Sequence, residues 1–303
     1  MERKKIIIGS RGSKLALIYA DKVKNEISKK FSHTVEIKVI KTLGDENQKD
    51  RLSEIGGKGL FSKKIEIELL DKKIDLAVHA LKDMPSDETN GLITNCFLKR
   101  NFPNEVLISR NNLTLDKLES NSVVGTSSFR REYQLKRKRN DLVYKLIRGN
   151  VDTRINKMNE GLYDAIILSK AGIDCLNLSN YITQEFSVNE IIPSVGQGII
   201  AIQCRDNDEE MINFLTKINH IHTNICATTE REVLKILEGD CDTAIGAFSF
   251  IEGNKINLIA ELFSIDGKKR YNFKATNELN FSKELGKNVG NFLKNKSEGN
   301  YKR

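Results

Sequence analysis

The chain has 303 residues, which is long enough for two or three domains that each bury a core. Its residues are 39% apolar and 30% charged, with a net charge of +8, a composition typical of a soluble globular protein with an anionic partner and not of a disordered chain. No apolar run reaches the length of a membrane span and the first residues lack a signal-peptide pattern, so we expect a cytoplasmic protein with no membrane partner.

Short apolar strands alternate with amphipathic helices through the first two thirds of the chain. Helices with apolar residues at helical spacing are predicted at 13–30 and 59–73. The strands are predicted at 4–10, 34–42, 74–80, 122–128, 141–149 and 163–169. This alternation is typical of parallel sheets with helices on both faces, and its interruption near residue 100 indicates two doubly wound α/β domains.

The C-terminal part of the chain has a different pattern. A helix at 229–239 precedes apolar segments that are joined by short turns with Gly253 and Gly267, which are hairpin signals. These segments lie at 241–251, 256–264 and 269–275, and a last helix is predicted at 282–295. We therefore predict a small α+β domain with an antiparallel sheet.

Cationic and hydroxyl side chains come directly after several of the predicted strands. Ligands of open α/β sheets bind outside the carboxyl ends of the strands, where helix N-termini also favour anions. The residues at these positions are Arg11 and Ser13, Lys82 and Asp83, Ser128, Arg130 and Arg131, and Arg148 with Arg154 one turn later. A single arginine of this kind is more often a surface charge paired with an acid. The recurrence at equivalent strand ends instead indicates a site that grips carboxylates or phosphates.

Asp83 is an acid in this cationic setting. It is either a turn residue before Met84 and Pro85, or a carboxylate that balances positive charge on a substrate and exchanges a proton with it. The residues alone leave both interpretations open.

The cysteines are scattered singly and form no CxxC pair, which argues against a disulfide framework and against structural zinc. They are Cys96, Cys175, Cys204, Cys226 and Cys241. The pair His220 and His222 has no third ligand nearby, so we expect no metal site. Cys241 lies among Glu238, Asp240 and Asp242, which should disfavour its thiolate. From its surroundings alone, it is a small apolar filler in a turn.

Two glycine-rich segments match nucleotide motifs only superficially. The segment 195–201 fits G-x-G-x-x-A, but no strand–turn–helix unit surrounds it, and it is better read as a crossing between domains. The segment 56–62 lacks the Ser or Thr that comes after the lysine of a phosphate loop, so we interpret it as a flexible loop that brings Lys58 near a ligand.

Eight segments, in order, resemble the porphobilinogen deaminase (hydroxymethylbilane synthase) family almost from end to end. They are GSRGSKLALIYA, KTLGD, GGKGLFSKKIE, DLAVHALKDMPS, GTSSFRREYQL, RGNVDTR, IIPSVGQGIIAIQCR and REVLKILEGDC. The resemblance implies a transferase of porphyrin biosynthesis that condenses four porphobilinogen molecules head to tail, with loss of ammonia. It then releases hydroxymethylbilane by hydrolysis. A dipyrromethane cofactor, joined by a thioether to a cysteine, serves as the primer.

The resemblance also implies roles for residues of this chain. Cys241 would be the cofactor anchor, alkylated once during assembly, and Asp83 would be the catalytic acid facing the pyrrole nitrogens. The cofactor carboxylates would be held by Lys82, Ser128, Arg130, Arg131 and Arg154. The incoming substrate would be bound by Arg11, Ser13, Arg148 and Arg154.

The family fold implies two periplasmic-binding-protein-like (type II) domains and a small third domain. The expected limits are 1–98 with 195–215, then 99–194, and 216–303 with the anchor cysteine. We expect a monomer. The chain departs from the family pattern at Glu54, Ala80, Cys175 and Asp240.

Two other functions compete with the deaminase. A non-catalytic anion-binding module would use the same arginines but would not need Asp83 and Cys241 in their motifs. A nucleic-acid binder would account for the basic charge, but no basic stripe with interleaved aromatic residues is present and the chain has no tryptophan. We therefore expect no nucleic-acid partner.

Overall fold

The structure is a computed structural model that describes residues 5–42, 62–240 and 242–302. The chain divides into two compact units. Unit 1 comprises Met1–Asn101 and Ile199–Ala227, and unit 2 comprises Phe102–Gly198 and Thr228–Arg303. The predicted three-domain limits stay a prediction, because the C-terminal sheet belongs to the same compact unit as residues 102–198.

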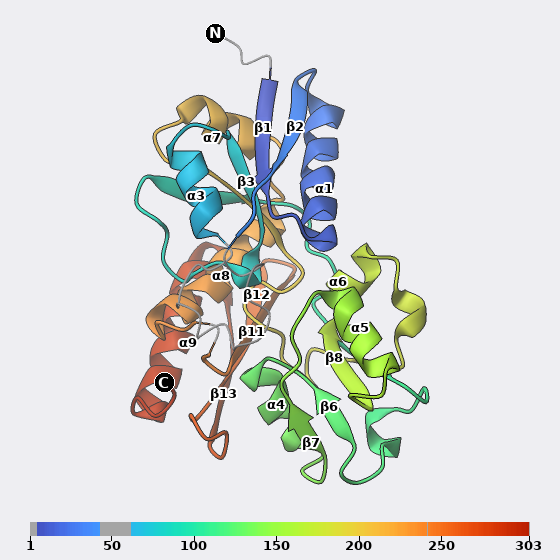
Figure 1. Ribbon diagram of the computed structural model, residues 1–303. Helices are drawn as coiled ribbons and strands as arrows, with labels where there is room; N and C mark the ends of the chain where they lie inside the picture. Colours follow the sequence, from blue (N-terminus) through green and yellow to red (C-terminus); the bar gives the residue numbers. More distant parts are fainter. Residues whose placement is uncertain (1–4, 43–61, 241, 303) are drawn as a thin grey trace. The chain divides into compact units, whose positions relative to one another are not determined.

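Unit 1 is built on a five-stranded sheet with the order β2-β1-β3-β10-β4. Its strands are β1 (Lys5–Ser10), β2 (Thr34–Val39), β3 (Leu76–Ala80), β4 (Leu92–Phe97) and β10 (Ile200–Arg205). Its helices are α1 (Lys14–Lys30), α3 (Lys63–Leu70), α7 (Glu209–Thr216) and the short 3-10 helix η1 (Leu81–Asp83). β1 runs parallel to β2 and β3, with α1 alongside them (Figure 1), whereas β10 runs antiparallel to β3 and β4.

Unit 2 repeats this topology in the order β7-β6-β8-β5-β9. The strands are β5 (Glu105–Ser109), β6 (Val123–Gly125), β7 (Val143–Lys145), β8 (Ala165–Ser169) and β9 (Gln184–Phe186). The helices are α4 (Phe129–Lys136), α5 (Val151–Asn159) and α6 (Lys170–Cys175), with the 3-10 turns η2 (Leu115–Lys117) and η3 (Ser179–Tyr181). β6, β7 and β8 are parallel, and β5 is antiparallel to β8 and β9.

The shared strand order confirms the two doubly wound, type II sheets, and each sheet departs from the parallel arrangement at one strand. In each sheet the antiparallel strand is the first one after the chain crosses from the other unit: β5 after residue 101, and β10 after residue 198. A strand that enters a sheet from outside its own β-α-β series has no crossover helix to set its direction, so it can run against its neighbours.

Apolar side chains cover both faces of the unit 2 sheet. Along β5 and β8, Leu107 and Ile167 belong to one buried cluster, and Val106 and Ile166 belong to another. Successive side chains of a strand point to opposite faces, so helices pack on both sides, as the strand–helix alternation predicts. Unit 1 has a corresponding cluster beneath α3, in which Ile65 and Leu69 meet Ile74 and Ala77.

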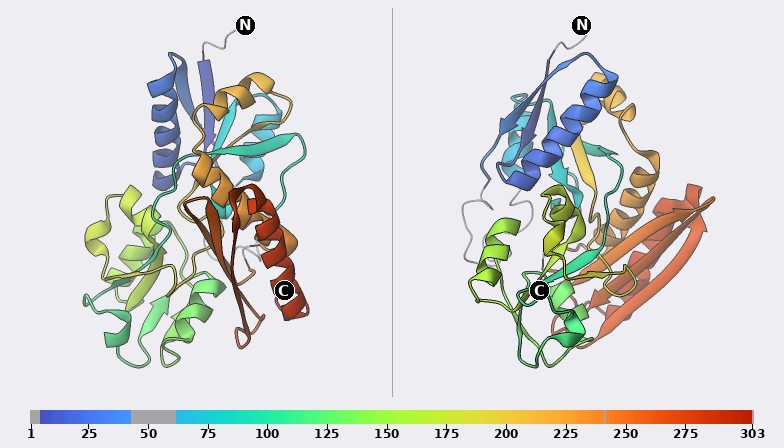
Figure 2. Two further views of the ribbon diagram at one scale, coloured as in Figure 1. Left: turned by 180° about the vertical axis from the view of Figure 1, so that it is seen from behind. Right: turned by 90° about the vertical axis from the view of Figure 1, so that its right-hand side faces the viewer.

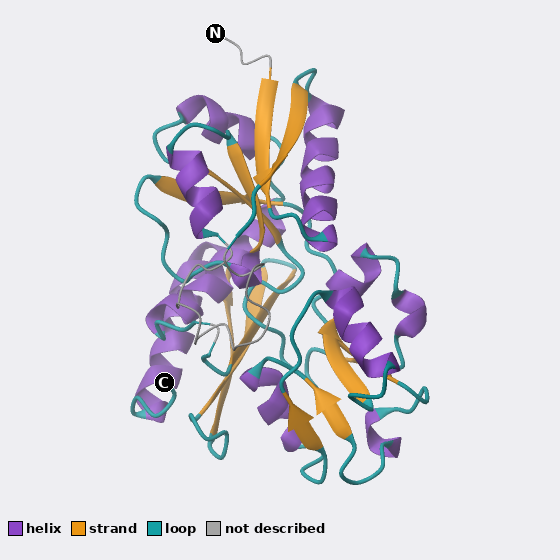
Figure 3. Cartoon of the chain, viewed as in Figure 1, coloured by secondary structure: helices purple, strands orange, loops and turns teal. Residues whose placement is uncertain are grey.

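The predicted antiparallel C-terminal sheet is confirmed. It consists of β11 (Ile245–Glu252), β12 (Lys255–Phe263) and β13 (Arg270–Glu278), joined by hairpins (Figure 2). After the 3-10 turn η4 (Leu279–Phe281), helix α9 (Ser282–Ser297) returns along the sheet (Figure 3). Helix α8 (Ile221–Ile236) begins in unit 1, and its last residues pack against α9 in unit 2.

The approach of α9 to α8 depends on two glycines one helical turn apart. A Cβ atom at Gly286 would lie 2.3 Å from the carbonyl oxygen of Thr229. A Cβ atom at Gly290 would lie 2.8 Å from Cβ of Ile236. Since both distances are far below van der Waals contact, side chains at these positions would push the helices apart.

Candidate functional site

In unit 1, the loops after β1 and β3 lie at one edge of the sheet. The two strands are parallel neighbours, with Ile8 opposite Leu76 and Gly9 opposite Ala77, so their carboxyl ends meet. The loop after β1 carries Arg11 and Ser13, and the 3-10 helix after β3 carries Lys82 and Asp83. We call these four residues the unit 1 edge. The structure therefore brings together the residues that the strand-end argument placed there, and their roles stay predictions.

Ser13 is engaged with its own helix. Its Oγ accepts a hydrogen bond from the Ala16 N–H (3.3 Å), which caps α1. The buried Ser10 hydroxyl donates to the carbonyl of Ala16 (3.1 Å) and fixes the same turn. The start of α1 is thus held in place, and its N-terminal dipole contributes positive potential beside Arg11.

Asp83 presents an exposed carboxylate at the end of β3. Backbone hydrogen bonds fix the turn around it, from Met84 N–H to Leu81 O (3.1 Å) and from Leu81 N–H to Ile199 O (3.0 Å). The flanking side chains of Leu81 and Met84 are buried with Phe97 in an apolar cluster. These contacts fix the backbone that carries the carboxylate, and the role of Asp83 stays a prediction.

His79 is a residue that sequence reasoning did not single out. It lies on β3, opposite Ala201 of β10, and is buried. Burial lowers the pKa of this imidazole to about 4, and the positive charge of Arg11 lowers it further, while the Gln203 side chain opposes the shift. The imidazole is therefore neutral at pH 7, so it adds no second positive charge beside the half-buried Arg11.

In unit 2, three parallel strands end at a common edge. Gly125 of β6 lies opposite Lys145 of β7 and Ile166 of β8. The loops and helix starts after β6 and β7 carry Ser128, Arg130, Arg131, Arg148 and Arg154. We call these five residues the unit 2 edge. The antiparallel strand β5 begins here, because Glu105 pairs with Ser169 at the end of β8.

Arg130 and Arg131 share one buried carboxylate. The Nη2 atoms of Arg130 and Arg131 lie 2.7 Å from Glu105 Oε1 and 2.7 Å from Glu105 Oε2, respectively. Glu105 is 0% exposed, and the arginines are 4% and 7% exposed. Burial lowers the pKa of Arg130, and the charge of Glu105 acts against that shift. The ion pairs thus keep two guanidinium cations together inside the protein.

The two arginines differ in which of their guanidinium nitrogens already have hydrogen-bond partners. Arg130 also donates from Nη1 to the carbonyl of Ile192 (2.8 Å), so both of its terminal nitrogens are engaged. Arg131 donates from Nη1 to the carbonyl of Ile167 (3.2 Å). Among the described residues, its buried Nε has no hydrogen-bond partner. A buried, unsatisfied N–H on a cation fits a carboxylate ligand.

Ser128 and Arg154 are held by local contacts at helix starts. The Ser128 Oγ accepts from the N–H of Arg131 (3.5 Å) at the N-terminus of α4. Arg154 donates from Nε to the carbonyl of Gly149 (2.8 Å). Gly149 has φ +115°, a conformation that residues other than glycine rarely adopt.

Arg148 lies in the same loop as Gly149 and is buried. Its carbonyl accepts a hydrogen bond from Lys157 Nζ (3.0 Å) of α5. The loop between β7 and α5 is thus tied back to its own helix, which keeps Arg148 and Arg154 on a common support.

Cys241 lies outside the described residues, as do Glu54 and Lys58. Of the acids around Cys241, Glu238 contacts Lys302 (2.6 Å) and Lys294 (3.4 Å), and these lysines lower the pKa of its carboxyl. Asp240 Oδ1 accepts hydrogen bonds from the N–H groups of Asp242 (3.0 Å) and Thr243 (3.2 Å). These two carboxylates are therefore held by other partners.

Two further departures from the family pattern are placed by the structure. Ala80 is the last residue of β3, and Cys175 is the half-buried last residue of α6. Within the described ranges, no helix is long and apolar enough to cross a membrane. Over the same residues, no group of three or more His, Cys, Asp or Glu side chains could hold a metal ion.

Comparisons with known proteins agree along nearly all of the chain. Residues 6–213 match a family model described as "Porphobilinogen deaminase, dipyromethane cofactor binding domain", and residues 224–295 match "Porphobilinogen deaminase, C-terminal domain". A porphobilinogen deaminase of Staphylococcus carnosus is 40% identical over 294 residues, covering 96% of this chain and 95% of the relative. One of a Geobacillus species is 42% identical over 293 residues, covering 96% and 94%.

Among solved structures, the chain is similar to the periplasmic VFT2 domain of Bordetella pertussis BvgS. The identity is 13% and the TM-score is 0.45, with 72% of this chain and 87% of that one covered. The two family models and the curated relatives, in contrast, cover nearly all of this chain. This chain belongs to the porphobilinogen deaminase family and uses that family's dipyrromethane cofactor.

Proposed function

We propose that this enzyme joins four porphobilinogen molecules head to tail on a dipyrromethane primer anchored at Cys241. Each condensation releases one ammonia, and water then releases hydroxymethylbilane from the primer. The observation that carries this proposal is the family match over both halves of the chain, together with the cationic unit 2 edge.

The two edges bind the acid side arms of the growing chain. Each pyrrole carries an acetate and a propionate, so every condensation adds two negative charges that need cationic partners. The cofactor carboxylates are held by Lys82, Ser128, Arg131 and Arg154, with Arg130 contributing its charge. The incoming substrate is bound by Arg11, Ser13, Arg148 and Arg154. An ion pair at about 4 Å is worth about 1 kcal/mol in water and about 4 kcal/mol at an effective dielectric of 20, so partial burial strengthens this grip.

The residues of the unit 2 edge fit the cofactor. The buried Nε of Arg131, which has no hydrogen-bond partner among the described residues, supplies a donor for one of its carboxylates. When bound, the dipyrromethane supplies the pyrrole carbon to which the first substrate is joined.

Asp83 is the catalytic carboxylate. When the amine of porphobilinogen leaves, positive charge develops on the substrate, and an anion held close to the pyrrole nitrogen stabilises that charge. The same carboxylate accepts and returns protons during the condensation. Its rigid turn between Leu81 and Met84 suits this role, because electrostatic catalysis requires a carboxylate that does not reorganise.

Cys241 acts once and does not turn over. An electrophilic pyrrole alkylates its sulfur when the holoenzyme is assembled, and the thioether then persists through every cycle. A standing thiolate is unnecessary for a single slow alkylation, which explains how a cysteine with acidic neighbours can serve.

The oligomeric state, cellular location and partners of the enzyme are proposed from its sequence. The enzyme acts as a monomer in the cytoplasm, its partner is the small molecule porphobilinogen, and it needs neither nucleic acid nor membrane. Light scattering on the purified protein measures its molar mass in solution, and the mass of a dimer would contradict the proposal that it is a monomer.

Intact-mass measurement of the denatured protein tests the anchor. The wild-type chain should carry an adduct of two pyrrole units, and Cys241→Ala should carry none. Cys175→Ala is the matched control and should keep the adduct. A wild-type chain that binds porphobilinogen but gains no adduct and releases no ammonia would be the non-catalytic anion-binding module.

A further inference from the structure

Glu105 holds a position that strand-end reasoning overlooks. It is the first residue of β5, and β5 runs antiparallel to β8, so its beginning lies at the edge where the parallel strands end. It is fully buried and contacts both adjacent arginines of α4 at 2.7 Å. An acid in the middle of an anion-binding edge needs an explanation.

The charges of this cluster do not cancel. Two guanidinium cations and one carboxylate leave one net positive charge, enclosed by buried groups. A further acid, Glu261 of β12, also acts on Arg130 through its charge and is itself paired with Arg270. One unit of positive charge therefore remains for a ligand, and it lies on the Arg131 side of the cluster.

Glu105 also fixes the direction of each guanidinium. Glu105 Oε1 accepts a hydrogen bond from Arg130 Nη2, and Glu105 Oε2 forms an ion pair with Arg131 Nη2. The carbonyls of Ile192 and Ile167 accept hydrogen bonds from the Nη1 atoms of Arg130 and Arg131, respectively. This leaves the Nε of Arg131 as the buried donor with no hydrogen-bond partner among the described residues. Without Glu105 the two cations would repel each other, and the guanidinium of Arg131 would be oriented only by its hydrogen bond to the Ile167 carbonyl.

We propose that Glu105 is a positioning residue for the cofactor site. It holds Arg130 in a structural role and orients the Nε–H of Arg131 towards a cofactor carboxylate. This inference rests on the proposed function, in which the unit 2 edge holds the cofactor. In this arrangement, Arg130 supports the structure of the cluster and Arg131 binds the cofactor.

The test compares primer loading in apoprotein variants. Each purified apoprotein is incubated with porphobilinogen, and the appearance of the adduct is followed by intact mass, alongside urea unfolding. We expect Glu105→Gln to load about tenfold more slowly, because a neutral amide cannot form ion pairs with two guanidinium groups. Glu105→Asp should recover most of the rate, since it keeps the charge.

A double variant separates orientation from charge and guards against misfolding. Glu105→Gln with Arg130→Met removes one negative and one positive charge, so the cluster keeps its net positive charge and avoids two unbalanced buried cations. We expect this protein to fold and still to load slowly, because Arg131 is no longer aimed. Loading at the wild-type rate by the double variant would overturn the proposal.

A matched control isolates simple loss of stability. Asp208 forms a buried ion pair with Arg205 in unit 1 (2.9 Å), and neither residue belongs to the unit 1 edge or the unit 2 edge. Asp208→Asn should lower the unfolding midpoint and leave the loading rate of folded protein unchanged. If the Glu105 variants lose loading only in proportion to their unfolded fraction, as this control would, Glu105 is merely structural. A wild-type chain that never gains the adduct would instead refute the proposed function, and this inference with it.

Discussion

The hydroxyl of Tyr301 donates a hydrogen bond to the main-chain carbonyl of Leu237, 3.2 Å away, which ties the C-terminal segment to the end of α8. Tyr301 is 2% exposed. The residue after Leu237, Glu238, has φ 51° and contacts Lys302. The last described residues of the chain thus brace the loop that leads into position 241.

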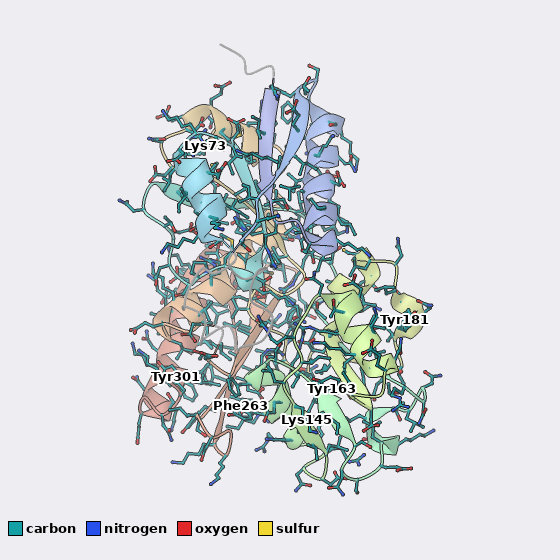
Figure 4. All side chains as sticks on the ribbon, viewed as in Figure 1. Lys73, Lys145, Tyr163, Tyr181, Phe263 and Tyr301 are labelled. Atoms are coloured by element: carbon teal, nitrogen blue, oxygen red, sulfur yellow. The ribbon has the colours of Figure 1, made fainter. Side chains whose placement is uncertain are left out.

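Tyr301→Phe should weaken this brace. Loss of one buried hydrogen bond should lower the free energy of unfolding by about 1 kcal/mol and leave the Leu237 carbonyl unsatisfied. Urea unfolding measures the change. Tyr181→Phe is the control, because Tyr181 is 40% exposed (Figure 4 labels both residues). Equal stability of the two variants would show that the hydrogen bond contributes nothing.

His79 should make the protein less stable in acid. The unfolded chain binds a proton at this imidazole near the ordinary pKa of 6.5, whereas the folded chain does so only near 4. Protonation of His79 therefore does not reduce the free energy of unfolding above pH 6.5. As the pH drops from 6.5 towards 4, it lowers that free energy by about 3 kcal/mol in total. His79→Gln should flatten this part of the stability curve.

The measurement for His79 is urea unfolding at several pH values between 4 and 7. The exposed His222, replaced by Gln, is the control and should leave the wild-type curve unchanged. A His79→Gln protein with the same acid sensitivity as wild type would mean that other groups cause it.

Gly286→Ala tests the close packing of α9 on α8. The added methyl group would meet the carbonyl oxygen of Thr229 and Cβ of Glu232, so the helices must separate. We expect a loss of about 2 kcal/mol or more in spite of alanine's better helix propensity. Asn288→Ala, at an exposed position of the same helix, should be neutral or stabilising. If both variants unfold alike, the interface adapts without cost.

The strand–helix alternation and the strand ends could be predicted, because periodicity and the common edge of parallel strands are local and geometric facts. The direction of β5 and β10 could not, since it depends on where each strand inserts after the chain crosses between units. Glu105 was missed for that reason: strand-end reasoning considers only the residues after a strand, and an antiparallel strand brings its beginning to the same edge. His79 was missed because its altered pKa arises from burial, which its neighbours in sequence do not encode.

Asp240, one of the expected departures from the family pattern, should organise the loop around position 241. Its carboxylate accepts from the N–H groups of residues 242 and 243, and its own N–H donates to Thr243 Oγ1 (3.1 Å). Asp240→Ala removes the acceptor, at a cost of about 1 kcal/mol, and should slow adduct formation severalfold. Asp240→Asn keeps the acceptor and should load like wild type.

The Asn variant also separates turn geometry from charge. If the Asp240 charge opposed the thiolate strongly, Asp240→Asn would load faster than wild type. Intact-mass time courses at pH 7 and 8.5 distinguish these outcomes. Wild-type loading by the Ala variant would show that the turn does not need this carboxylate.

Asp83→Asn should strongly slow turnover and leave the adduct in place. The amide keeps the shape of the side chain but cannot stabilise the developing positive charge or accept its proton, so we expect kcat to fall by about 10²–10³-fold. The turn is held by backbone bonds and buried neighbours, so the unfolding midpoint should not change. Asp87→Asn, a nearby exposed acid, is the control. Ammonia release per loaded enzyme is the measurement, and a loaded Asp83→Asn protein that turns over at the wild-type rate would transfer the catalytic role to another group.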